Sequence, residues 1–378
     1  MDFRFGVKIY DNDWFLRHGM TSEQAADLLA GWGATYVIAQ SKYLPMSDSA
    51  VTSAVSVTDS AAYEALDDVA FREHLRERNI GYLACLNICF DPAFANVHPQ
   101  DLGIDQWGKP GVQQDWYVGV PPVREANLQH KIALLEHAVA ALQPDAIHLG
   151  FIRWPGFWET WLDGDKRSEK SEYCFSPETI KQFNNETNSD VPCDDPIKAA
   201  ETIFAQHRDS WTHWKCEKVV AAIAGIRRAL DPIKPGLQYS INTLPFFQSD
   251  FDNAVEEVFG QNMAMLASVV DVFEVMAYHQ ILAKPETWPA AVSSDIIARS
   301  GQKAICTLQA KALYLDGMHA GMGRCEDISA GEFARALDAL APSPVEGVCV
   351  FTFTDLLDLR NTDKGRSMID ALKGFRQN

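Results

Sequence analysis

The feature that most constrains this chain is a regular alternation of strand-like and helix-like segments along its 378 residues. Eight short segments are nearly continuous apolar runs, as buried parallel strands are. They span residues 3–10, 35–40, 80–90, 146–152, 238–243, 271–278, 303–309 and 347–354. A helix that connects two parallel strands covers the face of their sheet, so repeated strand–helix units predict a parallel sheet. Eight such units predict a closed (β/α)8 barrel, the TIM barrel.

Signals at the ends of the helix-like segments support this division. Thr21 is a suitable N-cap, with Glu23 and Gln24 in the first turn, and Gly33 ends the same helix. Other helices are expected at about 60–78, 123–142, 254–269, 286–299, 329–340 and 364–375, with two helical stretches leading to residue 230. The alternative is an open doubly wound sheet, but no GxGxxG or GxxxxGK[ST] follows any strand. We therefore predict a single domain over 1–378, an α/β TIM barrel with long strand-to-helix loop insertions, the largest at about 153–196.

The charge and the cysteines limit the partners and the compartment. The net charge is −18, which opposes binding to nucleic acid or to an anionic membrane surface but suits neutral sugars. No run of ~18 apolar residues is present, so no spanning helix is expected. Eight dispersed cysteines form no CxxC pair, which favours a reducing compartment over a zinc site. With no basic and apolar leader at the start, the sequence predicts a cytoplasmic protein that needs no cofactor and is compatible with a monomer or a homodimer.

Aromatic residues gather where a barrel would place its site. In a TIM barrel the loops after the carboxyl ends of the strands surround the active site. Six tryptophans fall in such loops: Trp14, Trp107, Trp116, Trp154, Trp158 and Trp161. Because aromatic faces stack on the apolar faces of sugar rings, we expect at least two of them to line a carbohydrate cleft. The others would pack the insertions onto the barrel.

Two polar residues interrupt apolar strands. Glu274 lies within VFEVMAY, where a carboxylate is unfavourable unless it is paired or used. It could have a raised pKa and act as a general acid or base, or it could form a structural ion pair within the barrel. His148, in AIHLGF, could be a hydrogen-bonded core residue, or could join His279, Asp11 or Glu274 in a metal cluster. No HxH or HExxH spacing supports the cluster, so no metal site is predicted.

Short segments match a known pattern in order and spacing. The segment DAIHLGFIRWP, residues 145–155, resembles the fourth-strand signature of uncharacterised TIM-barrel glycoside hydrolase-like proteins, roughly DGIHLDFIRYP. YCFSPETIKQF (173–183), DVFEVMAYH (271–279) and FTFTDLL (351–357) are similar to other parts of that pattern. This resemblance implies a TIM-barrel hydrolase that acts on carbohydrate through carboxylates.

The chain departs from that pattern at Gly150, where the resembling families carry the expected catalytic aspartate. The missing side chain leaves room for a substrate ring or for a side chain from the next loop. Glu159, nine residues further on, could fold back as the replacement. Glycoside hydrolysis needs two carboxyl groups. The ranked catalytic candidates are Glu274, Asp355 and Glu159, followed by Asp11 and Asp13. The predicted substrate-binding residues are Asp11, Trp14, His148, Arg153, Trp154, Asn242, Tyr278 and His279.

Three functions are compatible with these features. The leading hypothesis is a glycosidase-like hydrolase that acts on a small soluble glycoside or oligosaccharide by carboxylate acid/base catalysis. The second is a metal-dependent or cofactor-free lyase or isomerase of a sugar or sugar acid. The third is a sugar-binding barrel without catalysis, which Gly150 makes credible.

Overall fold

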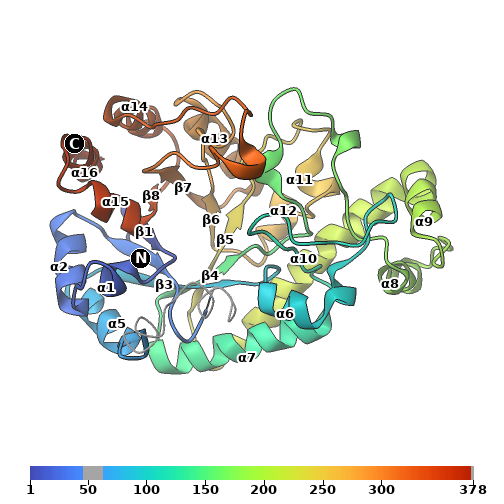
Figure 1. Cartoon of the computed structure of the whole chain (residues 1–378). Coiled ribbons are helices and arrows are strands. Elements are labelled where there is room, and N and C mark those ends of the chain that lie inside the picture. Colours follow the sequence, from blue (N-terminus) through green and yellow to red (C-terminus); the bar gives the residue numbers. More distant parts are fainter. Residues whose placement is uncertain (46–62, 376–378) are drawn as a thin grey trace.

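The computed structural model describes residues 1–45 and 63–375. Eight parallel strands pair in chain order, and β1 also pairs with β8, which closes a barrel (Figure 1). The strands are β1 (Phe5–Ile9), β2 (Tyr36–Ala39), β3 (Gly81–Asn87), β4 (Ala146–Gly150), β5 (Gln238–Thr243), β6 (Val272–Val275), β7 (Lys303–Gln309) and β8 (Gly347–Phe351). This topology confirms the predicted TIM barrel.

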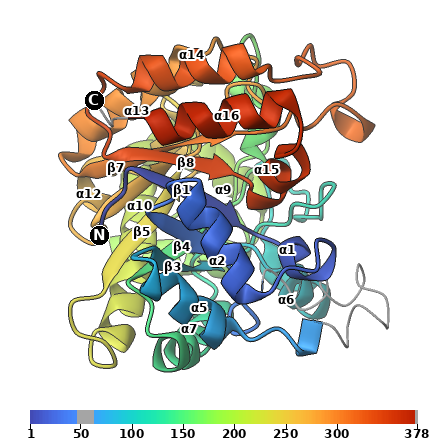
Figure 2. The same cartoon turned by 90° about the vertical axis from the view of Figure 1, so that its left-hand side faces the viewer.

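Helices surround the barrel, and α14 and α16 lie side by side against its outer face (Figure 2). The helices are α1 (Asp13–Leu16), α2 (Ser22–Gly31), α5 (Asp68–Glu77), α6 (Pro92–Val97), α7 (Glu125–Leu142), α8 (Pro177–Thr187), α9 (Pro196–Thr202), α10 (Arg208–Leu230), α11 (Ala254–Glu257), α12 (Met263–Leu266), α13 (Trp288–Ser300), α14 (Ala330–Leu340), α15 (Phe353–Leu359) and α16 (Asp363–Gly374). Short 3-10 turns are η1 (Pro99–Leu102), η2 (Trp158–Thr160), η3 (Arg167–Glu169) and η5 (Gly317–His319), and η4 (Ile203–His207) is a π-helical turn. None of the helices in the described ranges is both long and apolar enough to cross a membrane.

Most element boundaries follow the sequence signals closely. Thr21 caps α2 in a complete capping box with Gln24, as its sequence predicts. The segment predicted as one helix at 60–78 is helical at residues 63–64 and again from Asp68, where Asp67 caps α5, and residues 60–62 lie outside the described residues. The prediction of one helix at 254–269 is wrong.

That segment forms two short helices, α11 and α12, because the chain turns between them. Gly260 has a positive φ of 68°, and Asn262 then caps α12 by accepting a hydrogen bond from the Met265 N–H. The two helical stretches predicted to lead to residue 230 are α9 and α10, which η4 joins. Helix α15, which Thr352 caps immediately after β8, was not expected from the sequence.

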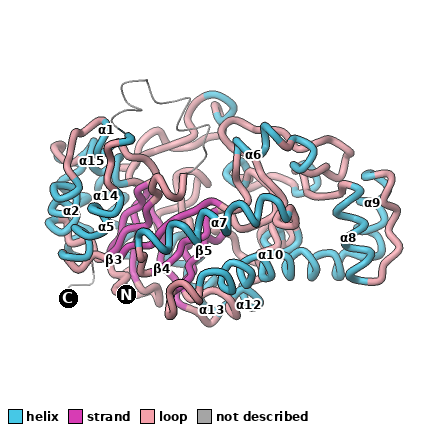
Figure 3. Tube along the Cα trace, turned by 90° about the horizontal axis from the view of Figure 1, so that it is seen from below, coloured by secondary structure: helices cyan, strands magenta, loops and turns pink. Residues whose placement is uncertain are grey.

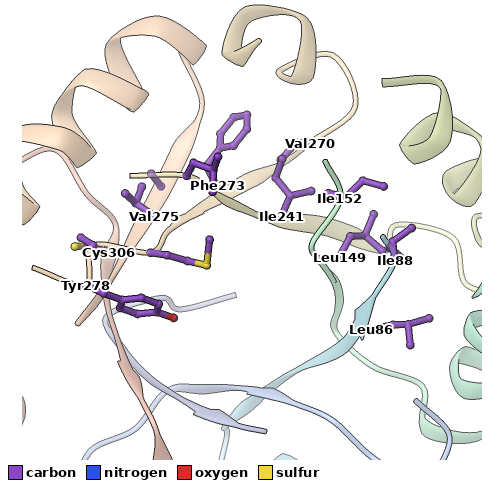
Figure 4. Close-up of a cluster of buried hydrophobic side chains, with 14 of the residues drawn as sticks. Leu86, Ile88, Leu149, Ile152, Ile241, Val270, Phe273, Val275, Tyr278 and Cys306 are labelled. Carbon is purple, nitrogen blue, oxygen red and sulfur yellow. The ribbon is translucent and has the colours of Figure 1, made fainter. Parts of the chain in front are cut away.

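Side chains on each strand alternate between two buried environments. One set faces the surrounding helices, and Figure 4 shows part of it, with Leu86, Leu149 and Ile241 on successive strands. The other set fills the barrel interior. Tyr36, the first residue of β2, closes the barrel interior at the amino-terminal ends of the strands, which we call the lower end. Its ring occupies the space beside Gly6, and its hydroxyl donates to the Val348 carbonyl at 2.9 Å. A Cβ on Gly6 would lie 2.3 Å from that ring, so only glycine fits there.

The segment after β4 extends away from the barrel. Figures 1 and 3 place α8 and α9 beyond the end of α10 that is farthest from the strands. Lys215 on α10 connects this segment to the end of α11. Its fully buried ammonium donates to the carbonyl of Tyr173 and to those of Glu257 and Val258. Burial lowers the pKa of Lys215 to about 8.

Candidate active site

A pocket of about 900 Å³ opens at the carboxyl ends of the strands, where a TIM barrel places its chemistry. We call it the mouth pocket. Its described lining residues come from the ends of strands or from the loops that follow β1, β3, β4, β6, β7 and β8. They are Tyr10, Asp11, Phe90, Pro92, Asn96, Gln113, Trp116, Phe151, Glu159, Asn242, Met276, Tyr278, Ile281, Leu313, Tyr314, Phe351 and Thr352. The two charged side chains among them are both carboxylates.

Glu159 is the buried carboxyl group of this pocket. It lies in η2, only 5% exposed, and its Oε2 has no hydrogen-bond partner among the described residues. Burial raises its pKa from the ordinary 4.5 to about 7, although the nearby charges of Arg153 and Arg324 oppose the rise. Arg324 also fixes the backbone here, because its Nη2 donates to the Glu159 carbonyl at 2.6 Å. A carboxyl group with this pKa can both give and take a proton near neutral pH.

Asp11 is the second carboxyl group of the pocket and is exposed to it. It follows β1 and accepts a hydrogen bond from Thr354 Oγ1 at 2.5 Å. Partial desolvation raises its pKa, and the neighbouring charges of Asp13 and Asp355 add to the rise. Asp355 is half-buried in the first turn of α15, where it accepts a hydrogen bond from Thr352 Oγ1 at 2.9 Å. Asp355 is therefore a neighbour of the pocket and not part of its lining.

Glu274 lies inside the barrel, fully buried and outside the lining of the mouth pocket. Lys8 Nζ is 2.8 Å from its Oε1 and 2.9 Å from its Oε2, and Thr307 Oγ1 donates to the same carboxylate. His148 Nε2 lies 3.4 Å from Oε2. This arrangement is the paired carboxylate that the sequence analysis held as the alternative to a catalytic one.

The interior cluster reaches the mouth pocket through Lys8, whose Nζ also lies 5.1 Å from the ring centroid of Tyr10 in the pocket lining. Lys8 Nζ lies 3.4 Å from the hydroxyl of Tyr278, which lines the pocket. Burial and the charge of Glu274 hold the pKa of Tyr278 well above its ordinary range, so its hydroxyl stays protonated. His148 is also neutral, because burial and the Lys8 charge lower its pKa well below the ordinary range. Glu274 thus contacts the site through Lys8.

The space beside Gly150 is already filled. A Cβ on Gly150 would lie 2.2 Å from Oδ1 of Asn87, which is its register partner on β3. The amide of Asn87 therefore occupies the place that an aspartate at position 150 would need. Neither amide atom of Asn87 has a hydrogen-bond partner among the described residues. The room expected there for a substrate ring is absent, whereas Glu159 from the next loop does line the pocket.

The structure separates the predicted substrate-binding residues into two groups. Asp11, Asn242 and Tyr278 line the mouth pocket. Asn242 also accepts a hydrogen bond from the Phe151 N–H at 3.1 Å, which fixes the backbone at the end of β4. His279 is 1% exposed and outside the pocket lining, with Nε2 2.8 Å from Glu332 Oε1, and among the described residues it belongs to no metal-holding group with His148.

The remaining predicted contacts are buried in the surroundings of the pocket. Trp14 stacks on Phe71 at 4.7 Å between ring centroids, and Trp154 donates to the carbonyl of Lys215. Arg153 is 1% exposed and lies over the ring of Phe151 at 4.7 Å. No hydrogen-bond partner for its guanidinium is found in the described part of the chain.

One of the six loop tryptophans, Trp116, lines the mouth pocket. Trp161 borders a separate, smaller cavity of about 210 Å³. Trp158 stacks on Tyr278 and is fully buried, and Trp107 is 41% exposed. One tryptophan lines the mouth pocket where at least two were expected in one cleft, because Trp14 and Trp154 pack against α5 and α10 and Trp158 packs against Tyr278 and Phe246.

Most of the aromatic residues that line the mouth pocket were not predicted as site residues. Tyr10 and Phe351 end or follow inward-facing positions of their strands, so the alternation on β1 and β8 could have identified them. Phe90 and Phe151 follow strand ends in the same way. Tyr314 lies in a long loop after β7 and carries no local signal. Within residues 1–45 and 63–375, no group of three or more His, Cys, Asp or Glu side chains is placed to hold a metal ion.

The fold is shared with solved carbohydrate-active enzymes. The glycoside hydrolase domain of PgaB (BpsB) from Bordetella bronchiseptica superimposes with a TM-score of 0.65 at 15% identity, over 98% of this chain and 99% of that one. The catalytic domain of β-amylase from Paenibacillus polymyxa gives 0.59 at 11% identity, over 99% and 98%.

A β-galactosidase from Bacillus circulans sp. alkalophilus gives a TM-score of 0.62 at 13% identity, over 100% of this chain and 56% of the other. This chain therefore spans about half the length of that enzyme. No protein-family model and no curated protein matches the sequence. At these identities the similarity establishes the common TIM-barrel fold.

Proposed function

We propose that this protein is a glycoside hydrolase that cleaves a small soluble glycoside with two carboxyl groups of the mouth pocket. The observation that carries the proposal is Glu159, a 5%-exposed carboxyl group with a pKa of about 7 on the wall of a pocket that also contains Asp11. A pair of carboxyl groups in different environments is what glycoside hydrolysis needs. The TIM-barrel fold of the solved glycoside hydrolases supports the same reaction class.

In this mechanism Glu159 is the general acid. Its proton moves to the glycosidic oxygen as the bond between that oxygen and the anomeric carbon breaks. Asp11, open to the pocket, acts as the base: it takes a proton from a water molecule whose OH adds to the anomeric carbon. One water is consumed, and the proton taken by Asp11 passes through solvent to Glu159, so that both carboxyl groups return to their starting states.

Glu274 has a different part in the proposal. Its carboxylate holds the Lys8 ammonium, which faces the Tyr278 hydroxyl from below the pocket. We assign Glu274 and Lys8 as positioning residues for Tyr278. Asp355 is assigned as a neighbouring charge that, with Asp13, adds to the rise in the pKa of Asp11 that desolvation causes.

The direct test is Glu159→Gln, assayed on 4-nitrophenyl and methyl glycosides of the common hexoses and pentoses. Removal of a general acid is expected to lower kcat by about 10²- to 10⁴-fold. The loss should be greater for methyl glycosides, since methanol is a poorer leaving group than nitrophenol and needs more help from an acid. Glu201→Gln, at an exposed site on α9, is the matched control and should leave kcat unchanged.

The pH profile gives a second readout. Wild-type kcat/KM should fall as the pH rises through about 7, because the acid must be protonated, and this limb should be absent in Glu159→Gln. Full activity in Glu159→Gln would refute the assignment. Saturable sugar binding without turnover by the wild type would instead identify a binding barrel.

A further inference from the structure

Apolar surface dominates the mouth pocket. Eleven of its seventeen described lining residues are aromatic or aliphatic, and seven of them carry aromatic rings. A chain of sugars presents hydroxyl groups on every side, and each one that is buried without a partner is unfavourable. The six polar side chains of the lining can form hydrogen bonds with one sugar ring. The pocket volume of about 900 Å³ lies near the upper end for small-molecule sites and exceeds what one sugar ring fills. The remaining space therefore suits an apolar group.

Rings from different loops make a continuous wall. Phe90 and Phe151 stack with centroids 5.0 Å apart, and the ring of Trp116 meets Phe151 edge-on at 6.0 Å. Trp116 Nε1 donates to the Tyr314 hydroxyl at 3.0 Å, which joins the loop after β3 to the loop after β7. Aromatic ligands prefer neighbours in these same offset and edge-to-face arrangements. The wall is thus already formed for a flat ring.

A hydrogen-bonded pair connects the same two loops at a second point. His319 Nε2 lies 3.3 Å from Asp115 Oδ2, and the His319 ring packs on Tyr314 with centroids 4.4 Å apart. Binding to a wall that is fixed before the ligand arrives loses little conformational freedom.

Four of the six polar lining side chains lie at or near strand ends or in η2, whereas Asn96 and Gln113 come from the segment after β3 that also carries Trp116. Asn242 is on β5, Asp11 and Thr352 lie within two residues of the ends of β1 and β8, and Glu159 is in η2. These four side chains can form hydrogen bonds with the sugar, whereas the aromatic wall can pack against the group that the sugar carries, the aglycone.

We propose that the mouth pocket holds an aromatic aglycone, so that the substrate is an aryl glycoside and not an oligosaccharide. This inference rests on the proposed function for the identity of the sugar-cleaving site, and on the pocket lining alone for the aromatic ligand.

The test is calorimetric binding of 2-naphthol, methyl β-glucoside and cellobiose to the full-length protein. The expected result is saturable binding of 2-naphthol, tighter than that of either sugar. Trp116→Ala should weaken naphthol binding about tenfold or more, corresponding to about 1.4 kcal/mol. Trp107→Ala, in the same loop but 41% exposed and outside the lining, should bind as the wild type does. Trp116→Phe keeps a ring and should retain most of the affinity.

The outcomes separate the two proposals. Tighter binding of cellobiose than of naphthol, or equal losses in Trp116→Ala and Trp107→Ala, would overturn the aromatic aglycone. The unfolding midpoints of all three variants, compared with that of the wild type, show whether a loss of naphthol affinity is caused by misfolding. If Trp116→Ala is misfolded, the affinity of Trp116→Phe decides whether the ring at position 116 binds naphthol. If naphthol binds as expected but no aryl glycoside is cleaved, the aromatic pocket stands and the hydrolase proposal fails.

Discussion

The raised pKa of Glu159 makes a stability prediction that requires no substrate. In the unfolded chain this carboxyl group titrates near 4.5, and in the folded protein at about 7. The folded state therefore holds a proton that the unfolded state has released between these values, and stability falls as the pH rises through that window. At about 1.4 kcal/mol per pH unit, the ionised form destabilises the fold by roughly 3 kcal/mol above pH 7. The side chain is 5% exposed, so solvent screens little of this penalty.

Glu159→Gln removes the titration and should remove the penalty. Integration over the window gives a small gain for the variant at pH 5 and a gain larger by about 2.5 kcal/mol at pH 8. Urea unfolding followed by tryptophan fluorescence at the two pH values measures this difference. Glu201→Gln is the control and should give the same change at both. A Glu159→Gln variant whose stability relative to the wild type does not change with pH would refute the buried, near-neutral acid.

Three further predictions concern the frame around the site. Lys8→Met leaves the Glu274 carboxylate buried without its cation and should cost about 3–5 kcal/mol in urea unfolding, whereas adding Glu274→Met should recover much of the loss. Gly150→Ala should lower the free energy of unfolding by about 1–3 kcal/mol, because its Cβ crowds Asn87. Adding Asn87→Ala should reduce that loss. A Gly150→Ala variant as stable as the wild type would contradict the contact. Thr21→Ala should cost about 1 kcal/mol through loss of the N-cap, seen as a lower thermal midpoint.

The barrel was predictable because its signals are local and repeated. β5 and β7 have the residues that the apolar runs indicate, and the cap at Thr21 forms as expected. Each buried parallel strand must be apolar on both faces, so the pattern survives without any knowledge of tertiary contacts. The barrel rule also brought Asp11 and Asn242 to the correct end of the strands.

The site was predictable only in part, because its remaining properties depend on distant contacts. The apolar strand around Glu274 indicates a carboxylate that is either paired or catalytic. The sequence cannot identify its partner, Lys8, which is 266 residues away. The low exposure of Glu159 results from folding of the loop after β4, which no periodicity describes. Likewise, a tryptophan in a loop carries no signal that distinguishes the pocket position of Trp116 from the core position of Trp154.

The Tyr36 ring that seals the lower end of the barrel has a kinetic consequence. With that end blocked, an aglycone freed in the mouth pocket has to depart on the side from which the next substrate arrives, past Trp116 and Tyr314. Departure and arrival then compete for one passage. Under the proposed function, the released aglycone is expected to be a competitive product inhibitor, and turnover should slow as aglycones become larger and flatter.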